Sequence, residues 1–149
     1  MKAKLFIYAL LLLTAISIGS CDDDDDEDSK GNAVTFTATI NGTSEVPTNA
    51  STATGMGNFK YDKTTYILSG TVTFTGITPA AAHIHKGAEG VAGPVIFPLG
   101  SAAPTSPINF TSPPLDATQR ADLMANMYYV NIHTTAFPDG EIRGQLKMK

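Results

Sequence analysis

The sequence lacks the features on which several classes of protein depend. It contains no tryptophan, one cysteine and only 8% aromatic residues in a chain of 149. A single cysteine excludes an internal disulfide framework and a zinc site built from paired cysteines. The few aromatic residues and the net charge of −4 argue against a nucleic-acid partner, because such proteins normally present a basic, aromatic-rich face. The length fits one domain.

Charge is also scarce, and it is unevenly distributed. Charged residues make up 16% of the chain, and half of the 14 acidic residues lie in one block at residues 22–28. From Val34 onward the remaining acidic residues are matched by an equal number of lysines and arginines. This part of the chain is therefore close to neutral, and electrostatic steering toward a charged polymer is not expected.

The N-terminal residues have the composition of a signal peptide. Two lysines in the first four residues precede an uncharged, mostly apolar run at residues 5–18. The run is short for a membrane span but suits the apolar part of a signal peptide. It ends in Ile18-Gly19-Ser20-Cys21, which resembles a lipobox, the motif in which a cysteine receives the lipid. We predict a signal peptide at residues 1–20 and lipidation of Cys21, with the membrane as partner of the acyl chains.

The acidic block directly follows the predicted lipid-bearing cysteine. Like charges at this density do not pack, so residues 21–33 are expected to form the lipidated end and an extended linker. Acidic residues in this position also resemble the surface-export signal of Bacteroidetes lipoproteins. The resemblance implies an outer-membrane lipoprotein exposed at the cell surface, and a protein that faces the periplasm is the alternative.

From residue 34 the sequence alternates apolar and polar residues with a period of two, which is typical of half-buried strands. Strands are predicted at residues 34–40, 54–61, 65–75, 81–86, 95–99, 108–110, 128–134 and 141–147. One helix is predicted from residue 116 to about residue 126, with Asp116 and Gln119 as a capping box. The pattern predicts an all-β domain over residues 34–149. Its expected form is an antiparallel β-sandwich, immunoglobulin-like or superoxide-dismutase-like, with one short helix.

Three histidines, His83, His85 and His133, are the residues best suited to chemistry. In a strand, positions 83 and 85 point to the same face, so both imidazoles can reach one ion. His133 ends another predicted strand, and the three rings converge if the two strands are neighbours. Three imidazoles with an open position suit Zn or Cu. No fourth ligand has diagnostic spacing, and the alternative is a polar, hydrogen-bonding surface without a metal.

Four further polar residues are expected to form a polar cluster near the histidines. Asn131 shares a strand face with His133, and Glu141 and Arg143 share a face of the following strand. Arg143 is interpreted either as an anion-binding group or as the structural partner of a carboxylate such as Glu45. No catalytic residue is predicted, because the sequence contains no nucleophile elbow, nucleotide-binding glycine loop or H-E-x-x-H motif.

Four motifs, in this order, resemble the chordin-type (CHRD) domain, and they lie between residue 34 and about residue 147. They are Glu45-Val46-Pro47, Ala81-Ala82-His83-Ile84-His85, Tyr129-Val130-Asn131-Ile132-His133-Thr134 and Pro138-Asp139-Gly140-Glu141-Ile142-Arg143-Gly144-Gln145-Leu146. One departure is Thr48, where the family often has a second proline. The resemblance implies an extracytoplasmic β-sandwich module. In animal chordin such domains accompany growth-factor binding, but a shared fold does not transfer that partner.

The H-x-H strand is also similar to the copper-binding strand of copper/zinc superoxide dismutase. That enzyme needs six histidines and an aspartate for its two metals, together with a disulfide. Three histidines and one cysteine do not supply this set, so a dismutase is not predicted.

Two hypotheses about function follow. The first is a lipid-anchored CHRD-domain protein that acts as a non-enzymatic binding or structural module at the cell envelope, with an unknown protein or glycan partner. The alternative is a mononuclear Cu or Zn site at His83, His85 and His133, used for metal binding or redox activity.

The lipid anchor is tested by Cys21→Ser, which removes the thiol that accepts the lipid. We expect the variant to leave the membrane fraction, because each buried methylene of the anchor contributes about 0.8 kcal/mol to membrane binding. Cell fractionation measures the distribution, with Ser29→Ala as the control. Unchanged membrane retention of Cys21→Ser would contradict lipidation.

Overall fold

The computed structural model describes residues 31–149; the predicted signal peptide, Cys21 and the acidic block lie outside these residues. The strands are β1 (Ala33–Asn41), β2 (Thr54–Asp62), β3 (Leu68–Thr75), β4 (Ala81–Lys86), β5 (Val95–Pro98), β6 (Ile108–Thr111), β7 (Tyr128–His133), β8 (Ile142–Gln145) and β9 (Lys147–Met148). A 3-10 turn, η2, spans Gly42–Ser44, and an α-helix, α1, spans Ala117–Met124. In this part of the chain no helix is long and apolar enough to cross a bilayer.

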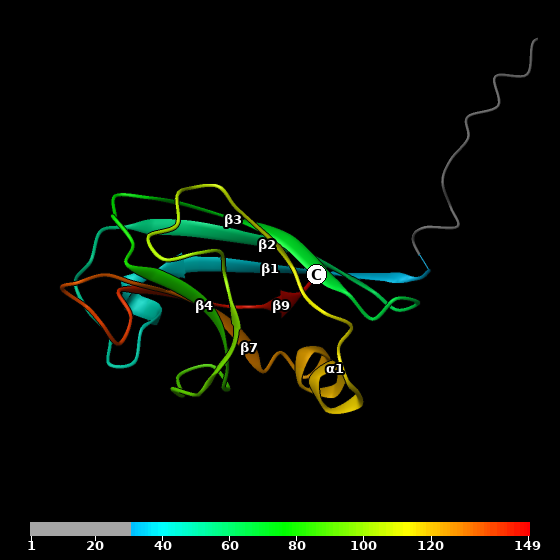
Figure 1. The fold of residues 1–149 in the computed structure, drawn as a ribbon. Coiled ribbons are helices and arrows are strands. Elements are labelled where there is room, and N and C mark those ends of the chain that lie inside the picture. Colours follow the sequence, from blue (N-terminus) through cyan, green and yellow to red (C-terminus); the bar gives the residue numbers. More distant parts are fainter. Residues whose placement is uncertain (1–30) are drawn as a thin grey trace, which may run out of the picture.

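The strands pair antiparallel in one continuous, curled sheet. Their order is β5-β4-β7-β8-β1-β2-β3-β6, and β9 lies beside β1. Strand β8 joins the two halves, since it pairs with β7 at four positions but with β1 only at Asn41 and Arg143. The strands β1, β2 and β3 form one layer, and β4 and β7 lie in the other (Figure 1). The predicted all-β fold with one short helix is confirmed, and its two layers belong to the same hydrogen-bonded sheet.

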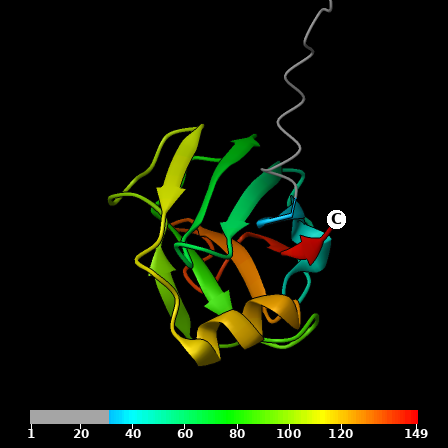
Figure 2. The ribbon, with the colours of Figure 1, turned by 90° about the vertical axis from the view of Figure 1, so that its right-hand side faces the viewer.

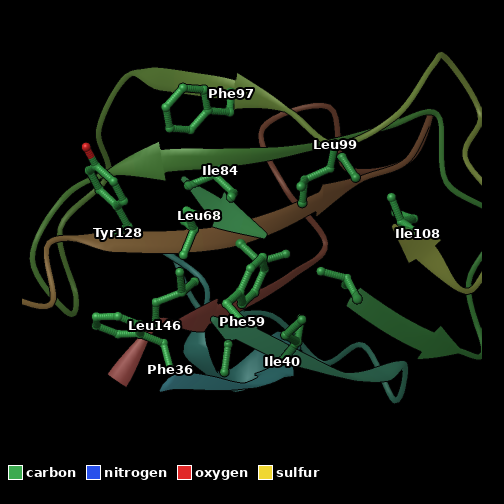
Figure 3. Close-up of a cluster of buried hydrophobic side chains, with 14 of the residues drawn as sticks. Phe36, Ile40, Phe59, Leu68, Ile84, Phe97, Leu99, Ile108, Tyr128 and Leu146 are labelled. Carbon is green, nitrogen blue, oxygen red and sulfur yellow. The ribbon is translucent and has the colours of Figure 1, made fainter. Parts of the chain in front are cut away.

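Apolar side chains from both layers fill the space between them. In β1, Phe36 and Ile40 are buried while Thr35 and Thr39 are exposed, so the period-two pattern directs one face inward. Ile84 of β4 is also fully buried. Figure 3 shows these labelled apolar side chains pointing into the same interior from the two layers. The opposite face of β4 and β7 is therefore free to carry polar side chains.

Helix α1 lies across one end of the layers (Figure 2), where it buries Leu123 completely. The Asp116 side chain accepts from Gln119 N at 2.8 Å, and Gln119 Oε1 accepts from Asp116 N at 2.9 Å. This is the predicted capping box. Beyond the helix, Asn126 adopts the left-handed conformation with a φ of 54°. The chain then enters β7 at Tyr128, and the capped helix thus positions the strand that carries the third histidine.

A prediction about stability follows from Gly144, which lies where β8 approaches β1. A Cβ atom at this position would meet Thr39 O at 2.5 Å and Ile40 Cγ1 at 2.7 Å. Because the backbone oxygen cannot rotate away, we expect Gly144→Ala to lower the free energy of unfolding by about 1–3 kcal/mol. Urea denaturation measures the loss. Gly31→Ala is the matched control, since nothing lies within 4 Å of its Cβ position; equal stability of the two variants would contradict the argument.

Candidate metal centre

Neighbouring strands β4 and β7 bring the three histidines together. In their antiparallel register, His83 is opposite Asn131 and Ala81 is opposite His133. The alternate residues Ile84 and Ile132 of the same strands lie in the apolar core, so the histidines project from the outer face of the sheet. One ligand atom from each of His83, His85 and His133 lies within 4.8 Å of the other two. The convergence expected for neighbouring strands is therefore present.

Backbone carbonyls determine the tautomers of two of the rings. His85 Nδ1 lies 2.9 Å from Gly93 O, and His133 Nδ1 lies 3.0 Å from Pro138 O. Because a carbonyl only accepts, each Nδ1 carries the proton and each Nε2 keeps its lone pair. His83 Nδ1 lies 3.1 Å from His133 Nε2 and donates to that lone pair. The Nε2 atom of His85 is buried and has no hydrogen-bond partner within residues 31–149.

Burial keeps the three imidazoles neutral. It lowers the pKa of each histidine, because the charged imidazolium loses its hydration. His85 lowers the pKa of His83 further, and the Arg143 guanidinium adds to the lowering at His85. The carbonyl contacts raise the pKa of His85 and His133, but by less than burial lowers it. The neutral form is the one that binds a metal ion.

The spacing of the nitrogens is close to that of a three-histidine metal site. Imidazole nitrogens bound at 2.0–2.1 Å to one zinc ion stand about 3.3 Å apart. The 3.1 Å between His83 Nδ1 and His133 Nε2 is close to this separation, and the ligand atom of His85 lies within 4.8 Å of the other two. His85 and His133 are 7% and 8% exposed, whereas His83 is only half-buried. The cluster therefore opens to solvent on the His83 side, where an ion could enter.

A stack of side chains stands behind His85. The rings of Tyr129 and His85 lie nearly parallel, with centroids 5.0 Å apart and an interplanar angle of 18°. Arg143 Cζ lies 3.4 Å from the centroid of the Tyr129 ring. Since β4 and β8 flank β7 on opposite sides, the Tyr129 ring separates the imidazole from the guanidinium. The sequence assigned no role to Tyr129, because only the register of three strands creates this stack.

Arg143 anchors the loop that joins β4 to β5. Its Nη2 donates to Ala88 O and Val91 O, both at 3.0 Å. The same loop supplies the Gly93 carbonyl that fixes the tautomer of His85. Within the described residues the guanidinium forms no ion pair with a carboxylate. Arg143 thus has a hydrogen-bonded structural role, but its partners are carbonyls.

Glu45 and Asn131 are both buried beside the turn after β7. In the described part of the chain, Glu45 Oε1 and Asn131 Oδ1 are buried without a hydrogen-bond partner. Asn131 Nδ2 donates to Asp139 O at 3.3 Å. Both side chains approach Gly140, whose φ of 134° and crowded Cβ position favour glycine. Burial raises the pKa of Glu45, while the Arg143 charge lowers it by less, so these two residues interact through space without an ion pair.

Glu141 connects two loops. Its carboxylate accepts hydrogen bonds from Ser51 Oγ and Thr134 Oγ1, both at 2.7 Å. Its backbone carbonyl accepts from Asn49 Nδ2 at 2.9 Å. The residue therefore holds the segment after η2 against the end of β7, and it is not among the residues at ligand distance from the histidines.

Comparison with known families assigns the folded region. The family model of the CHRD domain matches residues 36–146, which includes every strand from β2 to β8. The chain belongs to the CHRD domain family. Comparisons with curated proteins and with solved structures find no match. The CHRD assignment covers the fold, and the function has to be argued from the site itself.

The lowered pKa values of the histidines predict a loss of stability in mild acid. In the unfolded chain each histidine titrates near 6.5, whereas the folded CHRD domain resists protonation. Below about pH 6.5 the unfolded state therefore binds more protons, and the free energy of unfolding falls as the pH falls. We expect the full histidine contribution above about pH 6.5 and a decline toward about pH 5. Denaturant titrations at fixed pH, in the presence of a chelator, measure this.

Glu45 acts with the opposite sign, because its raised pKa makes the folded state bind its proton more readily as the pH falls. The measurement is therefore repeated with Glu45→Gln. The triple variant His83→Gln/His85→Gln/His133→Gln should show a flatter dependence between about pH 6.5 and about pH 5. The same slope in that variant would mean that other groups cause the acid sensitivity.

Proposed function

We propose that this protein is a lipid-anchored, extracytoplasmic CHRD module that binds one copper or zinc ion at His83, His85 and His133. The observation that carries the proposal is the state of His85 Nε2. This atom is buried and has no hydrogen-bond partner among the described residues. It keeps its lone pair because the proton of the ring is on Nδ1, which donates it to Gly93 O. A buried polar atom left in this way costs about 1–3 kcal/mol. A metal ion among the three rings would satisfy it.

The surroundings of the rings support the same proposal. Imidazole nitrogens suit Zn and Cu, whereas Ca and Mg prefer oxygen ligands. Metal-binding histidines usually donate their second nitrogen to a carbonyl or carboxylate, which fixes the ring orientation. His85 and His133 each do so, to Gly93 O and Pro138 O. A purely hydrogen-bonding surface does not need three neutral imidazoles, two of them buried, with one buried lone pair unused.

The proposed role is binding and not catalysis. The sequence contains no motif that pairs a nucleophile with a base, and the polar cluster around the histidines is occupied with holding loops. The anchor proposed at Cys21 would hold the module at the outer membrane. The acidic block that follows would favour display at the cell surface.

Metal binding is tested by calorimetry on the purified protein after treatment with a chelator. We expect one Zn or Cu ion per chain. His83→Ala removes one of three ligands and should weaken binding by more than the 10–100-fold typical of a change outside the ligand shell. Asn58→Ala, an exposed position on β2 in the other layer, is the control and should bind as the wild type does.

Elemental analysis of the titrated samples gives the stoichiometry. We expect about one equivalent of metal per wild-type chain, because a site with three imidazoles already in place should fill when metal is supplied. A metal content below about a tenth of an equivalent would overturn the proposal. Equal metal contents in the wild type and in His83→Ala would place the ion elsewhere.

A further inference from the structure

The ligands of the proposed site carry no negative charge. Within residues 31–149 no carboxylate or thiolate joins the three imidazoles at ligand distance. The groups that hold the remote nitrogens of His85 and His133 are the carbonyls of Gly93 and Pro138, which are also neutral. The immediate surroundings of the rings therefore do not offset the charge of a bound cation.

A positive charge lies behind His85, with the Tyr129 ring between the two groups. The Arg143 guanidinium stacks on the Tyr129 ring, which in turn stacks on His85. Arg143 is 2% exposed and bonds to carbonyls, and no ion pair neutralises it in the described part of the chain. Because water is excluded from this stack, the field of the guanidinium is weakly screened.

Three acids oppose this field, and each does so weakly. Glu89 acts on Arg143, but its side chain is exposed and forms an ion pair with Lys147 at 2.9 Å. Asp139 follows Pro138, whose carbonyl contacts His133, but the Asp139 side chain is exposed, so water and salt screen its charge. Glu45 is buried, but among the described residues it forms no ion pair with Arg143. Among these charged groups the buried Arg143 guanidinium is therefore the least screened by water, and we expect it to dominate the field at His85.

A positive field separates metal ions by their charge. It raises the energy of a divalent ion about twice as much as that of a monovalent ion at the same point. Coordination number acts in the same direction. Zinc almost always takes four ligands and Cu(II) prefers a tetragonal arrangement, whereas the singly charged Cu(I) ion also accepts three.

We propose that the site at His83, His85 and His133 selects Cu(I) over Cu(II) and Zn(II), and that Arg143 contributes to this selectivity through the Tyr129–His85 stack. Arg143 is thus a positioning residue, which places a positive charge near the ion without contacting it. The inference rests on the proposed metal site and adds the identity and oxidation state of its ion. The protein transfers no electron in this proposal, because it binds copper that is already reduced.

The selectivity is measured with each metal alone. Cu(I) is titrated against a copper(I)-specific chelator under anaerobic conditions with ascorbate, and Zn(II) and Cu(II) are titrated in parallel. We expect Cu(I) to bind at least about 100-fold more tightly than Cu(II) or Zn(II). Tighter binding of Zn(II) or Cu(II) would overturn the selectivity and leave the proposed function standing. Failure of all three ions to bind would overturn both.

The role of Arg143 is tested by comparing Arg143→Gln with Arg143→Lys. Both variants lose the Nη2 atom that donates to Ala88 O and Val91 O, but only lysine keeps the positive charge. We expect Arg143→Gln to lower the ratio of Cu(I) to Cu(II) affinity about tenfold, which is a fall of about 59 mV in the reduction potential of the bound copper. Arg143→Lys should keep most of the wild-type ratio.

Asp139→Asn supplies an independent test at an exposed position that does not depend on the buried arginine. Removing its negative charge should raise the ratio of Cu(I) to Cu(II) affinity, opposite in sign to Arg143→Gln. Circular dichroism establishes that each variant is folded. Wild-type potentials in Arg143→Gln, or a shift of Asp139→Asn in the same direction as Arg143→Gln, would overturn the role assigned to charge.

Discussion

Strand β7 is buried at all six of its positions, so both of its faces are shielded from water. One face carries Val130 and Ile132 into the apolar core, and the other carries polar groups such as those of Asn131 and His133. A polar atom that has lost water must find a partner or cost about 1–3 kcal/mol. The loops that cover this face follow from that constraint, because they supply the carbonyls that the polar side chains need.

The loops meet this requirement for some of these atoms, though not for His85 Nε2 or Asn131 Oδ1 within the described residues, and they build the proposed site at the same time. The turn after β7 brings Pro138 O to His133, and the loop after β4 brings Gly93 O to His85. Arg143 has two effects. It holds the loop between β4 and β5 through the carbonyls of Ala88 and Val91, and it places a positive charge near His85. A change that loosens this loop should therefore alter the state of the histidines as well as the fold.

Much of the secondary structure could be predicted, and the exceptions have physical causes. The strand predicted at residues 81–86 matches β4, since its alternation is clear. The strand predicted from residue 65 begins only at Leu68, because Tyr66 adopts a positive φ of 60° in the preceding turn. The run at residues 141–147 is divided into β8 and β9. There the sheet curls, and β8 pairs mainly with β7 while β9 pairs with β1.

By itself the sequence determined the period-two sorting of side chains, the capped helix and the common face of His83 and His85, because each depends on neighbours within a few positions. Only the tertiary structure decided that His133 joins that pair, that Tyr129 lies between His85 and Arg143, and that Arg143 bonds to carbonyls. These contacts depend on which strands pair and in what register. That choice is made by burying the whole curled sheet at once, and a local pattern does not contain it.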